Sequence, residues 1–239
     1  MKKLVLAFCI IPFISSCFGP KHLQTQLNRN QYPLGYLHDS QKNDEKLDIS
    51  ISPRIIDNSD TTYLTSVNKD DGHLLYLVFM YDYDYDYTIS LGKNSVKPSL
   101  PEFIKQSFIK ESERSGIYKI SDTTTTTSYN VLIEILDYKV FSKYHKNGSA
   151  FGGYQEWHID VQPSKGDLSM RLNISDIKNN VIFTKEYQSN KTSNFVKSRS
   201  TSENEINKNM MQNMTETLAQ CIKENISEIV KDINTTIRQ

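Results

Sequence analysis

The sequence predicts an α+β fold: a mostly antiparallel sheet of about five to six strands, one middle helix and one long C-terminal helix packed on one face. Three observations predict this class. Segments that alternate apolar and polar residues, as half-buried strands do, fill much of the chain after residue 46. Two segments open with helix-capping signatures. The second of them carries a single apolar stripe, as a helix lying across a sheet would.

The first expected strand alternates Leu47, Ile49 and Ile51 with polar residues and ends at Pro53. A loop-like stretch follows. The apolar run HLLYLVFMY then has the length of a strand and leads directly into alternating tyrosines and aspartates. We therefore expect a single domain over 47–239, in which a Tyr/Asp-rich hairpin insertion occupies about 63–95.

The middle helix is expected after Ser99, which forms a capping-box pattern with Glu102, while Pro101 suits the first turn. Gly116 is a natural end for this helix. Its apolar residues fall on one helical face: Leu100, Phe103, Ile104 and Phe108. The pattern predicts an amphipathic helix followed by a short strand, IYKI.

The second half of the domain is expected to be a run of strands. The segment 129–144 is apolar on both faces, as a central strand would be. The segment 146–153, KNGSAFGG, predicts a turn-rich loop. Three alternating segments, 154–163, 166–175 and 181–189, then predict an antiparallel meander with one buried face.

The C-terminal segment predicts a long amphipathic helix that opens with a capping box at Ser202 and Glu205. Its apolar residues recur every three or four positions: Ile206, Met210, Met214, Leu218, Cys221, Ile222, Ile226, Ile229, Val230 and Ile233. Packing on the sheet is the favoured interpretation. A helix lying on a membrane is the alternative, although the polar face mixes glutamates with lysines and such helices favour basic faces.

The N-terminal segment 1–16 predicts a secretory signal peptide. Lys2 and Lys3 precede a short apolar run, and Ser15 and Ser16 form a small-residue cleavage site. The apolar run is much shorter than the ~20 residues that span a bilayer, so we expect no retained transmembrane helix.

The end of this segment, Ile14-Ser15-Ser16-Cys17, resembles the bacterial lipobox. The resemblance implies cleavage before Cys17, a thioether-linked diacylglycerol on its sulfur and an acylated amino group. Several acyl chains hold a protein stably at a membrane. Phe18, where an aspartate would signal retention at the inner membrane, favours the outer membrane. The polar residues 17–46 predict a lipidated flexible tether with a reach of about 30 Å.

Charge and cysteine content limit the possible functions. The chain has 28 basic and 28 acidic residues, and this balance argues against a nucleic-acid partner. Of the three cysteines, Cys9 lies in the signal peptide and Cys17 takes the lipid. Cys221 therefore has no partner for an intramolecular disulfide, and its place on the apolar stripe predicts a buried, unreactive thiol.

The segment YDYDYDY raises the question of a metal site. Asp82, Asp84 and Asp86 match the first three ligands of a calcium loop, but position six is Tyr87 instead of glycine and position twelve is Lys93 instead of glutamate. On a strand these carboxylates would stand about 6.6 Å apart, too far to share one ion. We expect no metal and no cofactor.

The tyrosines would form a row on the other face of the same strand: Tyr81, Tyr83, Tyr85 and Tyr87. One interpretation is packing against the domain or simple exposure on a hairpin. The other is a contact surface for a partner or a glycan, because tyrosine is favoured at interfaces.

The sequence contains no catalytic pattern that spacing alone would mark. The five histidines form no HExxH or HxH motif, the glycines of 148–153 lack a P-loop lysine, and no serine stands in a GxSxG elbow. We therefore expect the protein not to be an enzyme.

The order of elements resembles that of small outer-membrane lipoproteins of the YajG type, and more distantly the auxiliary lipoproteins of ABC-type lipid transport and LptE-like lipoproteins. The resemblance lies in LPEFIKQSFIKESERSGIYKI, VLIEILDYKV and LSMRLNISDIKNNVIFTKEYQSN, and 63–95 departs from it. It implies a non-enzymatic envelope lipoprotein, anchored to the outer membrane by Cys17 and facing the periplasm. We expect it to bind another envelope protein in assembly or transport. A lipid- or glycan-binding periplasmic module is the alternative.

Overall fold

The computed structural model describes residues 20–36, 42–77, 80–121, 127–151, 154–194 and 202–238. The expected signal peptide and Cys17 lie outside these residues. In chain order the elements are α2 (Pro20–Leu27), β1 (Tyr32–Pro33), β2 (Ser50–Asp57), β3 (Ser66–Leu77), β4 (Met80–Ser90), the 3-10 turn η1 (Lys93–Ser95), β5 (Val96–Lys97), α3 (Leu100–Ser115), β6 (Lys119–Ile120), β7 (Tyr129–Phe151), β8 (Tyr154–Val161), β9 (Lys165–Asp176), β10 (Val181–Thr192) and α4 (Glu203–Thr236).

The strand β7 organises the main sheet. It has 23 residues, and so runs for about 70 Å. Its first half pairs with β2 in parallel and with β9 antiparallel, and its second half pairs antiparallel with β4 and β8. The eight-stranded sheet therefore consists of two halves joined through β7.

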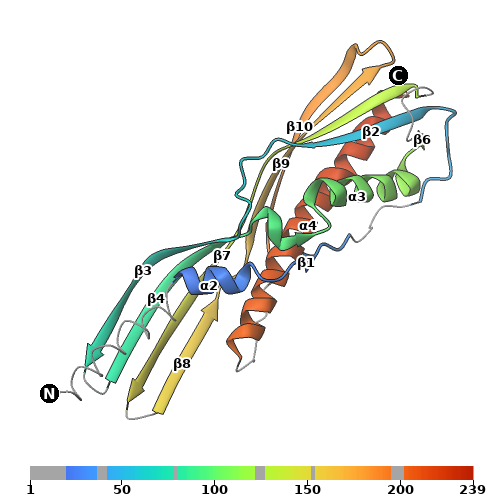
Figure 1. Cartoon of the computed structure of the whole chain (residues 1–239). Helices are drawn as coiled ribbons and strands as arrows, with labels where there is room; N and C mark the ends of the chain where they lie inside the picture. Colours follow the sequence, from blue (N-terminus) through green and yellow to red (C-terminus); the bar gives the residue numbers. More distant parts are fainter. Residues whose placement is uncertain are drawn as a thin grey trace.

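Figure 1 shows the two halves as an elongated molecule. The body half has the strand order β10-β9-β7-β2-β6 and carries the two long helices. The other half, which we call the arm, consists of β3, β4, β8 and residues 141–151 of β7. It projects from the body at the end opposite the β9–β10 turn.

The helix α4 covers one face of the sheet over a length of about 50 Å. Its apolar stripe is buried against β9, β10 and β7, as the recurrence of apolar residues every three or four positions predicts. The fully buried members include Met210, Met214, Leu218, Ile222 and Ile226. Since most of the core lies under this stripe, α4 closes the body half.

The helix α3 packs beside α4 and over β2. It begins after Ser99 and ends at Gly116, whose N–H donates to the carbonyl oxygen of Ser112. The predicted middle helix, the long C-terminal helix and the mostly antiparallel α+β class are all confirmed. The sheet is larger than the expected five to six strands, and β2 pairs in parallel with both of its neighbours.

Two expectations for the second half were wrong in detail. Residues 146–151 are not a loop but continue β7, where Gly148 pairs with Tyr83 and Trp157. The strands after it do not form a simple meander, because β8 and β9 each pair with a different half of β7. Because β7 is so long, β8 and β9 pair with it one after the other along the same edge and do not pair with each other.

The expected flexible tether, 17–46, is in part folded. Within the described residues, α2 buries Leu23 and Leu27 against the domain, and β1 pairs in parallel with β5. Asn28 fixes the end of α2, since its side chain accepts the N–H of Thr65 at 2.9 Å and donates to the Thr65 carbonyl at 2.8 Å. Two leucines four residues apart give a short helix one buried face.

We expect Ile222→Ala to lower the free energy of unfolding by about 2–5 kcal/mol, because Ile222 of α4 is fully buried in the core and alanine would leave a cavity. Gln220→Ala is the matched control, since Gln220 lies exposed on the same helix, and it should change stability by less than about 0.5 kcal/mol. Urea denaturation followed by circular dichroism measures both. Equal effects of the two substitutions would contradict the packing described here.

Candidate functional site

The tyrosines of the YDYDYDY segment form a row on the inner face of the arm, in which Tyr83 stacks on both Tyr81 and Tyr85 and Tyr87 is tilted. Their ring centroids lie 6.1 Å apart for Tyr81 and Tyr83, 5.9 Å for Tyr83 and Tyr85, and 5.9 Å for Tyr85 and Tyr87. Tyr144 of β7 extends the row, with its ring 6.2 Å from that of Tyr87. Alternate residues of β4 share one face, so the sequence period of two produces the row.

Two of the four tyrosines in this row are almost completely buried. Tyr83 and Tyr87 are 1% and 2% exposed, while Tyr81 and Tyr85 are half-buried. Burial raises the pKa of Tyr83 to about 12 and also raises the pKa of Tyr87 and Tyr144. Of the predicted contact surface, Tyr83 and Tyr87 therefore offer almost no area to a partner in this structure.

The first turn of α4 meets this row through one ion pair. The Nζ atom of Lys146, on β7, lies 2.7 Å from the Oε1 atom of Glu203 and 2.8 Å from its Oε2 atom. Lys146 is 9% exposed, so the pair is shielded from water more than a surface ion pair would be. The Glu203 carboxylate adds to the effect of burial on the pKa of Tyr144. The ion pair fixes the start of α4 over the middle of the arm, where Lys146 pairs with Tyr85.

Gly148 makes room for the Tyr83 ring. A Cβ atom at this position would lie 2.5 Å from the Tyr83 hydroxyl oxygen and 2.7 Å from the Glu156 carbonyl oxygen. Both distances are far below van der Waals contact, so any side chain here would displace the ring or the neighbouring strand. The glycine that predicts a turn in the sequence therefore has a packing role inside a strand.

The outer face of the arm carries the carboxylates of the same segment. The Nδ1 atom of His145 lies 3.0 Å from Asp86 Oδ1 and 3.6 Å from Asp84 Oδ1, and His73 lies 3.9 Å from Asp82. The described part of the chain contains no group of three or more His, Cys, Asp or Glu side chains that could hold a metal ion. The carboxylates thus lie beside histidines across the strands. A shallow polar groove of about 270 Å³ runs along this face between Asp84, Asn147 and His158.

The far end of the arm, which we call the arm tip, exposes apolar side chains from both of its hairpins. They are Leu74, Leu75, Tyr76 and Leu77 of β3, Phe151 of β7 and Tyr154 of β8. The sequence predicts an ordinary apolar strand for the four residues of β3 and gives no direct sign that they are exposed together with Phe151 and Tyr154. The available signal was that no charged residue occurs from 74 to 81 or from 147 to 155.

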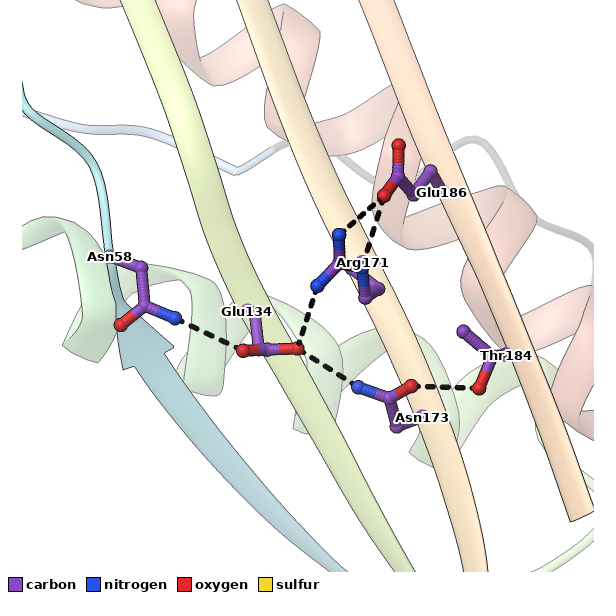
Figure 2. A network of polar contacts seen from close by, with 6 residues as sticks. All are labelled: Asn58, Glu134, Arg171, Asn173, Thr184 and Glu186. Carbon is purple, nitrogen blue, oxygen red and sulfur yellow. Dashed lines mark hydrogen bonds and ion pairs between the residues drawn. The ribbon is translucent and has the colours of Figure 1, made fainter. Parts of the chain in front are cut away.

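The outer face of the body half carries a network of polar side chains, drawn in Figure 2. Glu134 of β7 lies at its centre and accepts hydrogen bonds from Asn58 at 3.0 Å and Asn173 at 2.9 Å. Arg171 lies 3.8 Å from Glu134 and donates to Glu186 at 2.6 Å. The network links β7, β9 and β10 across the sheet, as cross-strand pairs do, and we assign it a structural role.

Two further features bear on chemistry. Cys221, on α4, is fully buried, so its predicted place in the core is confirmed, and burial raises the pKa of its thiol. Among the described residues, no helix has the length and hydropathy needed to span a membrane.

Comparisons with known proteins identify a fold and no activity. No protein-family model matches the chain, and no curated protein matches it. A crystal structure of a Xanthomonas campestris protein described as DUF330 matches over 88% of this chain and 97% of its own, with a TM-score of 0.52 and 9% identity. A structure of an uncharacterized protein covers 86% of this chain and 99% of its own, with a TM-score of 0.42 and 7% identity. The first match shows a shared fold, and the resemblance to YajG-type lipoproteins stays a prediction.

We expect Gly148→Ala to lower the free energy of unfolding by about 1–3 kcal/mol, because the new methyl group overlaps the Tyr83 hydroxyl. A loss of stability would be informative, since replacing glycine with alanine in a permitted conformation usually increases the free energy of unfolding. Thermal unfolding and the tyrosine signal in near-ultraviolet circular dichroism measure the change. The control is Ser149→Ala on the outer face, with an expected change below about 0.5 kcal/mol. An unaltered tyrosine signal in Gly148→Ala would count against the packing of the row.

Proposed function

We propose that the protein is a non-enzymatic bacterial envelope lipoprotein, held at the periplasmic face of the outer membrane by an acylated Cys17. In this proposal its α+β domain binds another envelope protein and supports assembly or transport there. The observation that carries the proposal is the lipobox-like Ile14-Ser15-Ser16-Cys17 followed closely by a folded domain.

The position of α2 supports a close attachment. Its first residue, Pro20, follows Cys17 by three positions, which an extended chain spans in at most about 11 Å. The helix packs against β3, the outermost strand of the arm. A lipid on Cys17 would therefore hold the arm near the membrane surface, and not at the end of a long tether.

The arm is the proposed surface for the partner. No described strand pairs with the outer edge of β3 or of β8, so both edges present backbone donors and acceptors. The base of β3 is protected by charged residues at 69–71 and by a bulge between Lys69 and Asp71. The outer face offers the Asp/His side chains for polar contacts with a partner.

The alternative of a lipid- or glycan-binding module has less support. The space between α4 and the sheet is filled by fully buried side chains such as Met214 and Leu218, so a ligand there would have to displace them. The tyrosine row is largely covered, with Tyr83 and Tyr87 almost fully buried. A ligand held under α4 or against Tyr83 and Tyr87 would therefore have to displace packed side chains.

We expect Cys17→Ala to abolish acylation and to remove the protein from the outer-membrane fraction, because the thioether can form only on the cysteine sulfur. Metabolic labelling with a radioactive fatty acid, together with separation of membranes by density, measures both effects. Phe18→Leu, next to the same cleavage site, serves as the control and should keep both properties. Unchanged acylation and fractionation in Cys17→Ala would overturn the proposed anchoring.

We expect a photo-crosslinking amino acid at Asp86 or His158 to capture a specific envelope protein in intact cells. Both residues are exposed on the outer face of the arm. The matched position is Glu186, exposed on the body half, where the same product should be absent. Crosslinked products at Glu186, with none at Asp86 or His158, would place the partner surface on the body half and contradict the proposed role of the arm.

A further inference from the structure

The arm tip has an unusual distribution of exposed apolar side chains. The six residues Leu74, Leu75, Tyr76, Leu77, Phe151 and Tyr154 are between 41% and 70% exposed. Soluble proteins scatter such residues singly, whereas here they lie at one end of one structural unit. A cluster of exposed apolar side chains indicates a surface that becomes buried when the protein binds a partner or a membrane.

Strand pairing brings the six residues together. Leu77 pairs with Met80, Met80 pairs with Phe151, and Phe151 pairs with Tyr154, so both hairpins of the arm end side by side. Neighbouring strands lie about 4.8 Å apart, so the four strand ends form one edge about 15 Å wide. The arm tip is thus one apolar surface assembled from residues far apart in the sequence.

The exposed residues of β3 face in two directions. Leu74, Leu75, Tyr76 and Leu77 are consecutive, and consecutive side chains of a strand point to opposite faces of the sheet. A protein partner laid against one face would leave the other face in water. An apolar medium that surrounds the tip would cover both faces at once.

We propose that the arm tip inserts into the interfacial region of a lipid bilayer. The open outer edge of β3 limits the depth, because unpaired backbone N–H and C=O groups are not tolerated in the hydrocarbon region. Tyr76 and Tyr154 suit this depth, since tyrosine is enriched where membrane and water meet. The direction of approach rests on the proposed lipid anchor, because α2 packs on β3 and begins three residues after Cys17.

The charges near the arm tip predict how its insertion depends on the headgroup charge of the lipid. The first charged residues inward on β4 and β8 are Asp82 and Glu156, and both are acidic. Membrane binding through charge requires basic clusters near the surface. Insertion of the arm tip is therefore driven by apolar contact, and it should not increase with anionic lipid or decrease with salt.

Fluorescence of single tryptophans tests the proposal in the full chain purified with its native lipid. The sequence contains one tryptophan, Trp157, so Trp157→Phe gives a background free of tryptophan emission. Leu75→Trp and Tyr154→Trp then place a probe on each hairpin of the arm tip. Ile182→Trp is the matched control, because Ile182 is 47% exposed and Leu75 is 49% exposed, and Ile182 lies at the start of β10 in the body half. Circular dichroism checks that each variant is folded.

The proteins are reconstituted in vesicles of phosphatidylcholine with or without bromine on the acyl chains. We expect brominated lipid to quench the emission of both arm-tip probes by about twofold or more, as for side chains at interfacial depth. The Ile182→Trp emission should stay unchanged. The same quenching is expected with phosphatidylglycerol added and at high salt.

The possible outcomes separate this inference from the proposed anchoring. Vesicles that carry the acylated protein with no quenching at either arm-tip probe would overturn insertion and leave the anchor intact. Absence of quenching combined with concentration-dependent crosslinking through Leu75 would overturn it in favour of a second copy of the chain. Quenching of the arm-tip probes in a protein that proves not to be acylated would support insertion and overturn the proposed anchor.

Discussion

Backbone pairing on both edges of β7, which passes through a bulge between Ile135 and Asp137, is the constraint on which the rest of the structure depends. Buried N–H and C=O groups need partners, so a 23-residue strand persists only if each neighbour that leaves is replaced at once. On one edge, β2 ends and β4 begins, and the gap is bridged where Asn58 and Leu91 donate to the carbonyl oxygens of Ile135 and Val140. On the other edge, Gln162 donates to Lys143 between the ends of β8 and β9.

The exchange of partners divides the molecule into parts with different roles. Where β9 and β2 flank β7, with β10 beyond β9, the sheet presents an apolar face wide enough to bury α4 and α3. Where β4 and β8 flank it, with β3 beyond β4, α4 reaches as far as Lys146, about halfway along the arm segment of β7, through the Lys146–Glu203 ion pair. The covered half supplies the packed core, and the projecting half supplies open edges, a polar outer face and an apolar tip. Both functional proposals place interactions on the arm because α4 and α3 already cover the apolar face of the body half.

Local sequence signals predicted the helices well and the strand neighbours poorly. The residues Ser99, Glu102 and Gly116 predicted the bounds of α3, although the Ser99 side chain makes no capping hydrogen bond and Glu102 accepts from Gln106 instead. By contrast, nothing within 146–153 indicates that β4 and β8 flank it, and without those neighbours its glycines predict a loop. For the same reason, Leu23 and Leu27 gave too weak a signal for a packed helix, since their contacts lie on distant β3 and α4.

By itself, the sequence determined the α+β class, the two main helices, the buried thiol of Cys221 and the alternation that puts four tyrosines on one face. These follow from periods of two and about 3.6 residues, which the backbone imposes locally. Tertiary structure alone decided that Tyr83 and Tyr87 are buried while Leu75, Phe151 and Tyr154 are exposed together. Alternation fixes which residues share a face, but only the arrangement of distant strands and helices decides whether that face meets the core or the solvent.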